Sequence, residues 1–398
     1  MMLKPLYRSG GEKCLINKPF EPRVLTDCDF AGVDISDAVK AAAIGGSEFF
    51  RKRFDEGALF PGMACEIADI DMDEELTVHN YTGQCPVQTF ELNPVKGCNV
   101  GCAYCLANDG IHEPVPVAYR NYPEYVSAKL AEYMNEEHYF YYSPKTEAFC
   151  EATLQTGIAH GILRAFIEHF EGYPDSKARL FIASKAGTEA LGFEYGGDSI
   201  LSLFKKLKGR MQFNTSLSIF PEGAISYIEP YSSSLTSRLE AVKLCRESGI
   251  TAGSALVQPI LITMLTDELL DDFFALLSRY RVVNIKPEFL TACVENMALM
   301  AQILEMYDDK ALKKLFETWF RDDNLDHIKQ RGRTAPPRAL SVYWIKKMKA
   351  AAERYGISTS ICYWVREQLG IGEDEIPIIN SNGYKCLGYQ TRLFDAAT

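Results

Sequence analysis

The chain has 398 residues, of which 47% are hydrophobic and 24% are charged, and this ordinary balance allows a large buried core. The formal net charge of −11 argues against tight electrostatic binding of duplex nucleic acid, which needs a basic face. No apolar run reaches the roughly 18 residues of a membrane span, and the first residues lack the apolar region of a signal peptide. We therefore expect a cytoplasmic protein without membrane association, whose twelve cysteines are thiols or metal ligands and not disulfides.

Six apolar segments have the length and composition of β-strands, and helical patterns separate several of them. The expected strands are 89–94, 138–143, 179–184, 211–218, 254–260 and 282–290. The helical patterns run from about 122 to 135, 151 to 171 and 233 to 249. Strands that alternate with helices predict a parallel sheet with helices packed outside it.

The fold class that we expect is α/β, in the form of an open, partial (β/α)6 barrel over residues 88–307. In this interpretation residues 1–87 are an N-terminal extension and residues 308–398 are a C-terminal extension. The loops that follow the strands carry the chemistry in related barrels. The residues just after each expected strand are therefore the candidates for a functional site.

A cysteine-rich loop, "VKGCNVGCAYCLAND" (95–109), follows the first expected strand. Its three cysteines, Cys98, Cys102 and Cys105, have the spacing C-x3-C-x2-C. They are open to three interpretations. Buried cysteines pack as small hydrophobic residues, and a structural zinc site needs a fourth ligand, for which Cys85 and His112 are the nearest candidates.

The third interpretation is an iron–sulfur cluster, for which thiolates are suitable ligands. Glycine and asparagine between the cysteines indicate a loop and not a core segment. Three thiolates on a four-iron cluster leave one iron open to bind a substrate or cofactor. The pattern therefore favours a cluster, and the other nine cysteines are too irregularly spaced to predict a second one.

The cysteine loop closely resembles the signature of the radical S-adenosylmethionine (radical SAM) superfamily, including the aromatic Tyr104 before the last cysteine. The resemblance implies that Cys98, Cys102 and Cys105 hold a 4Fe-4S cluster whose open iron chelates SAM. It implies reductive cleavage of SAM to a 5'-deoxyadenosyl radical, which abstracts hydrogen from a substrate. An external electron donor such as flavodoxin or ferredoxin is implied as a partner. The type of reaction (lyase, mutase or bond-forming) stays open.

A second stretch, residues 225–260, resembles the spore photoproduct lyase-like group of that superfamily. The shared features are Glu229 with Pro230, Arg238 with Leu239, and an apolar strand that ends at Ile260. The match runs from about Phe90 to Pro287, and the flanking regions do not resemble that group. Glu229 and Arg238 are expected to form a structural ion pair that shapes the loop, in preference to direct ligation.

The resemblance also implies which residues bind SAM at the strand ends. Thr146 and Glu147 hold its amino group, although both residues also suit the N-cap of a helix. Lys185 neutralises its carboxylate, and the alternative is a surface lysine at the end of a strand. The implied contacts to the remainder of SAM are Tyr104 near the adenine, Ser184 beside Lys185, and Ser216 and Ser218 at the ribose hydroxyls, where the two serines otherwise face the barrel interior.

The chain departs from the lyase-like group at its hydrogen donor. That group places a cysteine just before the polar strand-end cluster, where this chain has Ser143 and Pro144. The next cysteine, Cys150, lies at an expected helix start. A hydrogen-atom relay through the same thiol is therefore not expected.

Three functions follow from the sequence. The first is a radical SAM enzyme that acts on a small-molecule or nucleoside-like substrate. The second is lyase-like repair or modification of nucleic acid, which the acidic charge disfavours. The third is a non-catalytic metal-binding module. The sequence does not identify the substrate or say whether SAM is consumed.

Overall fold

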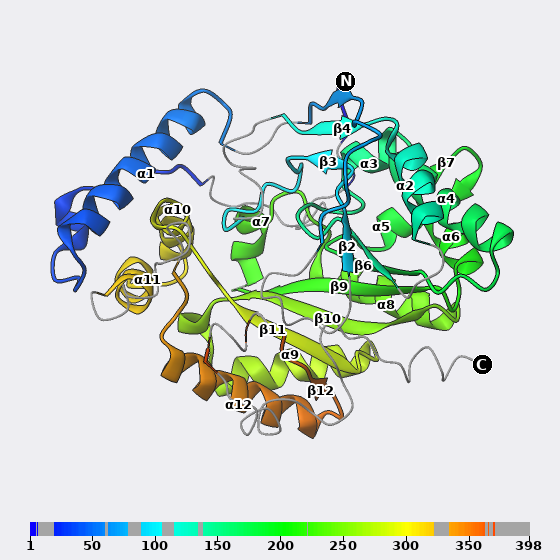
Figure 1. Cartoon of the computed structure of the whole chain (residues 1–398). Coiled ribbons are helices and arrows are strands. Elements are labelled where there is room, and N and C mark those ends of the chain that lie inside the picture. The colour runs from blue at the N-terminus through cyan, green and yellow to red at the C-terminus, as the bar shows by residue number, and fades with distance from the viewer. Residues whose placement is uncertain are drawn as a thin grey trace.

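A parallel β-sheet of seven strands forms the centre of the molecule (Figure 1). The computed structural model describes residues 1–4, 6, 20–59, 63–78, 89–105, 115–133, 138–220, 222–321, 334–362, 365 and 369–370. The strands are β2 (Thr89–Leu92), β5 (Tyr139–Tyr142), β6 (Arg179–Ser184), β9 (Met211–Ile219), β10 (Thr251–Ile260), β11 (Asn284–Phe289) and β12 (Ser358–Thr359). Each strand pairs in parallel with the next one along the chain, in the order β12-β11-β10-β9-β6-β5-β2.

The α/β fold and all six expected strands are confirmed, and β6 has the expected bounds. The short seventh strand, β12, was not expected. The helices that connect or follow the sheet strands are α2 (Tyr122–Glu132), α3 (Glu151–Gln155), α4 (Ile158–Gly172), α5 (Thr188–Leu191), α6 (Ile200–Lys206), α7 (Ile225–Ile228), α8 (Leu235–Glu247) and α9 (Asp267–Arg279). The segment 151–171 divides into α3 and α4 at Gly157.

The two faces of the sheet differ in character because successive strand side chains point to opposite faces. On one face, Phe213 and Leu217 of β9 join the buried hydrophobic clusters that include the helices. On the other face, β9 presents Asn214, Ser216 and Ser218, all buried. We call this second face the polar face. A small aromatic and aliphatic cluster lies there as well, formed by Tyr139, Tyr141, Phe181 and Leu256.

A second, three-stranded sheet flanks the three cysteines in the chain, with two strands before them and one after. Its order is β1 (Glu66–Ala68), β4 (Val117–Tyr119) and β3 (Val95–Lys96). Strand β3 follows β2 after two residues and pairs with β4 through Val95 and Ala118. Two paired strands, β2 in the large sheet and β3 in the small one, therefore fix the chain just before the first cysteine. The remaining short elements are β7 (Glu194–Tyr195), β8 (Asp198–Ser199), η2 (Glu222–Ala224) and η3 (Ile262–Met264).

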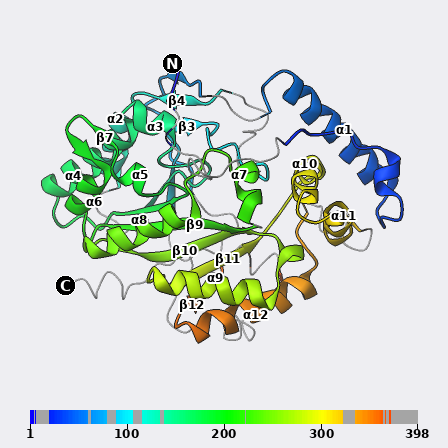
Figure 2. The same ribbon diagram turned by 180° about the vertical axis from the view of Figure 1, so that it is seen from behind.

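Of four further helices, three lie together at one end of the molecule and the last lies beside β12 (Figures 1 and 2). They are α1 (Asp37–Asp55), α10 (Val294–Glu305), α11 (Ala311–Phe320) and α12 (Arg338–Arg354). Helix α1 packs on α10 at Gly46, where an added Cβ would lie 2.8 Å from the Cα of Glu295. The segment before α1, which includes η1 (Asp27–Phe30), contacts α11 through the rings of Phe30 and Phe316, whose centroids are 5.2 Å apart.

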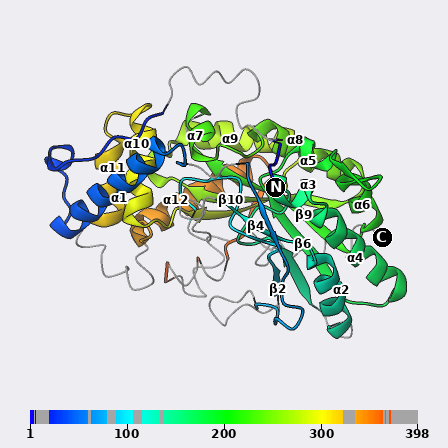
Figure 3. The same cartoon turned by 90° about the horizontal axis from the view of Figure 1, so that it is seen from above.

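Viewed from above, α1, α10 and α11 lie at one end of the molecule, and α2, α4 and α6 lie at the other (Figure 3). The N-terminal segment therefore covers helices that come late in the chain. Among the described residues, every helix is too short or too polar to cross a membrane.

Candidate functional site

The cysteine loop leaves the carboxyl end of β2 and turns back through two glycines. Gly97 and Gly101 have φ values of 78° and 67°, in the left-handed region that favours glycine. The backbone N–H of Cys105 donates to the carbonyl oxygen of Cys102 at 3.0 Å, which closes a tight turn around the last two cysteines. All three cysteines therefore lie on one compact loop.

Contacts from distant parts of the chain hold this loop. The Ala103 N–H donates to the carbonyl oxygen of Ile228 at 2.9 Å, and the Tyr231 N–H donates to that of Val100 at 3.3 Å. The side-chain amide of Asn296 on α10 donates to the carbonyl oxygen of Ala103 at 2.9 Å. No motif in the sequence marks Asn296 for this role, because its partner lies almost two hundred residues away.

Burial raises the pKa of two thiols of the loop, those of Cys98 and Cys102. Burial raises the pKa of Cys98 well above its ordinary value, and the thiols of Cys150 and Cys105 raise this pKa further. Backbone hydrogen bonds from Val100 and Glu147 act in the opposite direction. Burial likewise raises the pKa of Cys102, which Lys185 lowers in part. Metal binding would therefore release protons from this loop.

The arrangement of these thiols bears differently on zinc and on a cluster. Among the residues that the structure describes, no three Cys, His, Asp or Glu side chains converge on one metal ion. A structural zinc ion needs four such ligands around a single centre, and Cys85 and His112 lie outside the described residues. A four-iron cluster does not need this convergence, because each thiolate binds a different iron. A compact loop with three coupled thiols fits that group.

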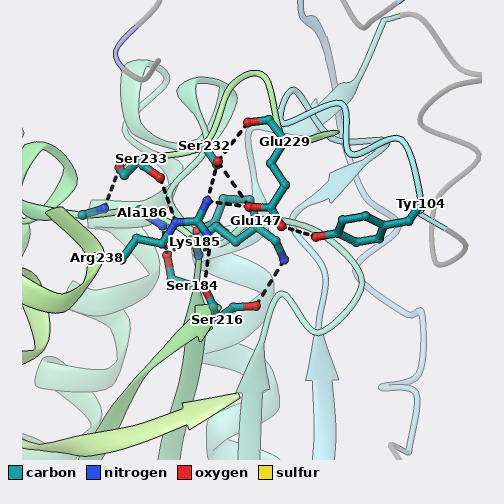
Figure 4. Close-up of polar contacts among 11 residues, drawn as sticks. Tyr104, Glu147, Ser184, Lys185, Ala186, Ser216, Glu229, Ser232, Ser233 and Arg238 are labelled. Atoms are coloured by element: carbon teal, nitrogen blue, oxygen red, sulfur yellow. Dashed lines mark hydrogen bonds and ion pairs between the residues drawn. The ribbon is translucent and has the colours of Figure 1, made fainter. Parts of the chain in front are cut away.

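A buried ion pair lies directly against the loop (Figure 4). The Arg238 Nη2 is 2.5 Å from Glu229 Oε2, and the two side chains are 1% and 0% exposed. The hydroxyl of Tyr104 donates to the other oxygen of Glu229. Arg238 also donates to the carbonyl oxygens of Ser216 and Ser233, at 3.0 Å and 2.8 Å. The expected structural ion pair is confirmed, and it connects the cysteine loop to β9 and α8.

The charge of Glu229 is strongly stabilised in this network. Burial alone would raise the pKa of its carboxyl group, but the guanidinium of Arg238 and the ammonium of Lys185 outweigh burial and lower the pKa to about 2. Tyr104 also lies beside Phe220, with ring centroids 6.0 Å apart and planes 25° apart. Tyr104 is therefore fixed by both its hydroxyl group and its ring.

Glu147, expected to contact SAM, already has three donors from within the protein. The Ser184 hydroxyl donates to Oε1, the Lys185 N–H donates to Oε2 at 2.7 Å, and the Phe149 N–H donates to Oε1 at 3.2 Å. These bonds tie the loop after β5 to the end of β6. The helix-cap alternative is wrong, because the N-cap residue of α3 is Cys150.

Lys185 points into the network and not to the surface (Figure 4). Its Nζ donates to the Ser216 hydroxyl at 3.1 Å and lies 5.9 Å from the centroid of the Tyr104 ring. Burial lowers the pKa of Lys185, but the carboxylate of Glu229 and the neighbouring Cys102 outweigh burial and raise this pKa. The side chain is therefore a half-buried cation between β6, β9 and the cysteine loop. The surface-lysine alternative is wrong.

Two of the expected SAM contacts have hydroxyl groups that the protein leaves unsatisfied. Within the described part of the chain, Thr146 Oγ1 and Ser218 Oγ are buried and have no hydrogen-bond partner. Ser216 and Ser218 both lie on the polar face of β9, as the barrel-interior alternative also expects. The structure thus brings Tyr104, Glu147, Ser184, Lys185 and Ser216 into one network.

Of the two residues that concern hydrogen donation, Cys150 lies close to the cysteine loop. Cys150 is fully buried as the N-cap of α3, and its thiol raises the pKa of Cys98. Burial raises the pKa of Cys150 to about 12. Ser143 is buried with a left-handed φ of 55°, which is uncommon outside glycine.

Comparison with known proteins does not assign this chain to a family. No protein-family model matches it, and no curated protein matches it either.

Proposed function

We propose that this protein is a radical SAM enzyme that acts on a small-molecule or nucleoside-like substrate. The observation that carries the proposal is the loop of Cys98, Cys102 and Cys105, which leaves the first strand of a sequentially ordered parallel sheet. This strand order also supports an open, partial (β/α)6 barrel over residues 88–307, with extensions on both sides. In this proposal the three thiolates hold a 4Fe-4S cluster.

The polar groups beside the loop suit the binding of SAM. Lys185 supplies a cation for a carboxylate, and Thr146 and Ser218 supply buried hydroxyl groups that lack a protein partner. Glu147 and Ser184 hold the backbone that carries Lys185. When bound, the cluster and SAM together supply reductive cleavage of SAM and hydrogen abstraction from the substrate. The electron comes from an external donor such as flavodoxin or ferredoxin.

Anaerobic reconstitution with iron and sulfide tests the proposal. We expect about four irons per chain and a brown protein, as a cubane implies, and we expect 5'-deoxyadenosine after addition of dithionite and SAM. The variant with Cys98, Cys102 and Cys105 all replaced by Ala should lose both. Cys245→Ala is the matched control, because this buried thiol lies on α8, outside the loop.

Other results would support the alternatives. Iron binding without any cleavage of SAM would favour a non-catalytic metal-binding module. Tight DNA binding that weakens steeply with salt would favour a nucleic-acid substrate. Full iron content in the triple variant would contradict the cluster assignment.

A further inference from the structure

Four polar residues lie together where β2 and β5 end, beside the cysteine loop. They are Glu91, Asn93, Ser143 and Lys145, which we call the β2–β5 cluster. The paired register of the two strands ends at Leu92 and Tyr142, and the Ser143 N–H donates to the Leu92 carbonyl oxygen at 2.7 Å. Asn93 and Ser143 therefore follow the strands as neighbours. None of these four residues has a role in the proposed iron–sulfur and SAM site described above.

Ser143 combines two unfavourable features. Its φ of 55° is left-handed, and the residue, only 2% exposed, has a hydroxyl group without a partner among the described residues. Left-handed backbone in a non-glycine residue and an unsatisfied buried hydroxyl both cost free energy. Such groups are rare in folded proteins and call for an explanation. A ligand that bonds to the hydroxyl supplies one.

Asn93 presents a second unsatisfied atom at the same place. Its Nδ2 donates to Glu91 Oε2 at 3.0 Å, which fixes the orientation of the amide because a carboxylate only accepts. Its Oδ1 is buried and has no partner within the described residues. Asn93 therefore leaves one hydrogen-bond acceptor unsatisfied, on the residue that neighbours Ser143 after the paired strands.

The charges of the cluster are already paired. Lys145 Nζ is 2.8 Å from Glu91 Oε2, and the Glu91 side chain is 1% exposed. The groups left to contact a ligand are therefore neutral: one amide oxygen, which accepts, and one hydroxyl, which can donate. The rings of Tyr141 and Phe181 lie on the same polar face, edge to face, with their centroids 4.7 Å apart. This combination suits a neutral, flat ligand better than an ionic one.

We propose that the β2–β5 cluster binds the amide edge of a nucleobase as part of the substrate. The base N–H donates to Asn93 Oδ1, and an adjacent base carbonyl accepts from the Ser143 hydroxyl. Nucleobases are read in this way, through hydrogen bonds to the Watson–Crick edge. The net charge of −11 favours a free nucleoside over a nucleic acid. The inference rests on the proposed function, since it names the substrate class of that site.

The test measures uridine binding to the full-length chain by calorimetry, with and without iron and sulfide treatment. Uridine has an N–H between two carbonyls, and 3-methyluridine lacks that N–H. We expect uridine to bind, and 3-methyluridine to bind roughly tenfold more weakly, as the loss of a hydrogen bond predicts. Ser143→Ala, Ser143→Gly and Asn93→Ala should each weaken uridine binding to a similar extent, and SAM affinity should stay at the wild-type value.

Two comparisons separate binding from folding. Ser143→Gly removes the hydroxyl but relieves the left-handed backbone, so its melting temperature should equal or exceed that of the wild type. Ser254→Ala is the control, because this buried polar-face hydroxyl is already bonded to Asn284 at 3.1 Å. It should leave uridine binding unchanged.

The inference is overturned if uridine does not bind, if both nucleosides bind equally, or if Ser143→Gly binds like the wild type. Loss of SAM affinity in the Ser143 and Asn93 variants would also overturn it, since these residues would then belong to the SAM site. If uridine binding depends on Ser143 but the chain holds no iron and does not cleave SAM, the inference stands and the proposed function fails.

Discussion

Replacement of Arg238 by Met tests whether the buried ion pair holds the cysteine loop. Methionine keeps much of the length of the side chain but leaves the Glu229 carboxylate, 0% exposed, without its main counter-charge. Removing one partner of a buried ion pair typically costs about 3–5 kcal/mol of folding free energy. We therefore expect Arg238→Met to lose stability in that range at pH 7.

The pKa of Glu229 gives an independent magnitude. Its folded value of about 2 lies below the ordinary 4.5, although burial alone would raise it, because Arg238 and Lys185 stabilise the charge. At about 1.4 kcal/mol for each pKa unit, this difference is worth roughly 3 kcal/mol. Because the folded pKa is depressed, this stabilisation is complete above about pH 4.5 and is lost as the pH falls toward 2. The difference in free energy of unfolding between the wild type and Arg238→Met should therefore become smaller at acidic pH.

Urea denaturation at pH 7 and at pH 3 measures both effects. Glu229→Gln, and the double variant with Arg238→Met, complete a thermodynamic cycle. The double variant should lose less stability than the sum of the two single variants, because no unpaired charge remains buried. Lys243→Met on the same helix is the control: its ion pair with Glu247 is about half exposed, so the change should cost less than about 1 kcal/mol. Additive losses, or Arg238→Met as stable as the control, would refute the reasoning.

Four further experiments address single residues of the site. Tyr104→Phe should lower the free energy of unfolding in urea by about 1.5–3 kcal/mol, because it removes a hydrogen bond to a buried carboxylate; an unchanged midpoint would contradict this contact. Lys185→Ala should weaken SAM binding in calorimetry roughly tenfold or more with full iron content, and unchanged affinity would return Lys185 to a structural role. Glu147→Ala should also weaken SAM binding, but its three internal bonds predict a parallel fall in melting temperature, and a loss of SAM affinity alone would show direct contact. Cys150→Ala should leave the product unchanged when the reaction runs in deuterated water; solvent deuterium that appears in the wild-type product and disappears in the variant would establish a thiol relay.

Most of the strands were predictable from the sequence because they are short apolar runs, as expected for a parallel sheet buried on both faces, whereas β9 alternates apolar residues with polar ones. β6 has the expected bounds, and β9 extends only one residue beyond them. The cysteine loop was predictable from spacing alone. Each of these signals is local, so neighbouring residues in the sequence were sufficient to read it.

The contacts that hold the loop were mostly not predictable. Asn296 binds the Ala103 carbonyl oxygen from α10, and no periodicity or motif marks it. Strand β12 has two residues and pairs with β11 over that length only, which is too short for a hydrophobic pattern to indicate. Gly46 appears in the sequence as an ordinary helical glycine. A side chain there would collide with the backbone of Glu295, which comes much later in the chain. Each of these features depends on tertiary neighbours.

The pairing of polar atoms divides the candidate residues in a way that the sequence did not. Glu147 was expected to bind SAM, yet in the structure its carboxylate accepts hydrogen bonds from protein donors, as does that of Glu229, which was expected to be structural. Carboxylates that accept hydrogen bonds from the protein hold strands and loops in place. A ligand that displaced these donors would lose as much hydrogen-bond energy as it gained. Thr146, Ser218 and Ser143 instead have buried hydroxyl groups without partners among the described residues, so a ligand would satisfy them at no such cost. The residues that bind ligands are therefore better sought among the unsatisfied hydroxyls than among the carboxylates.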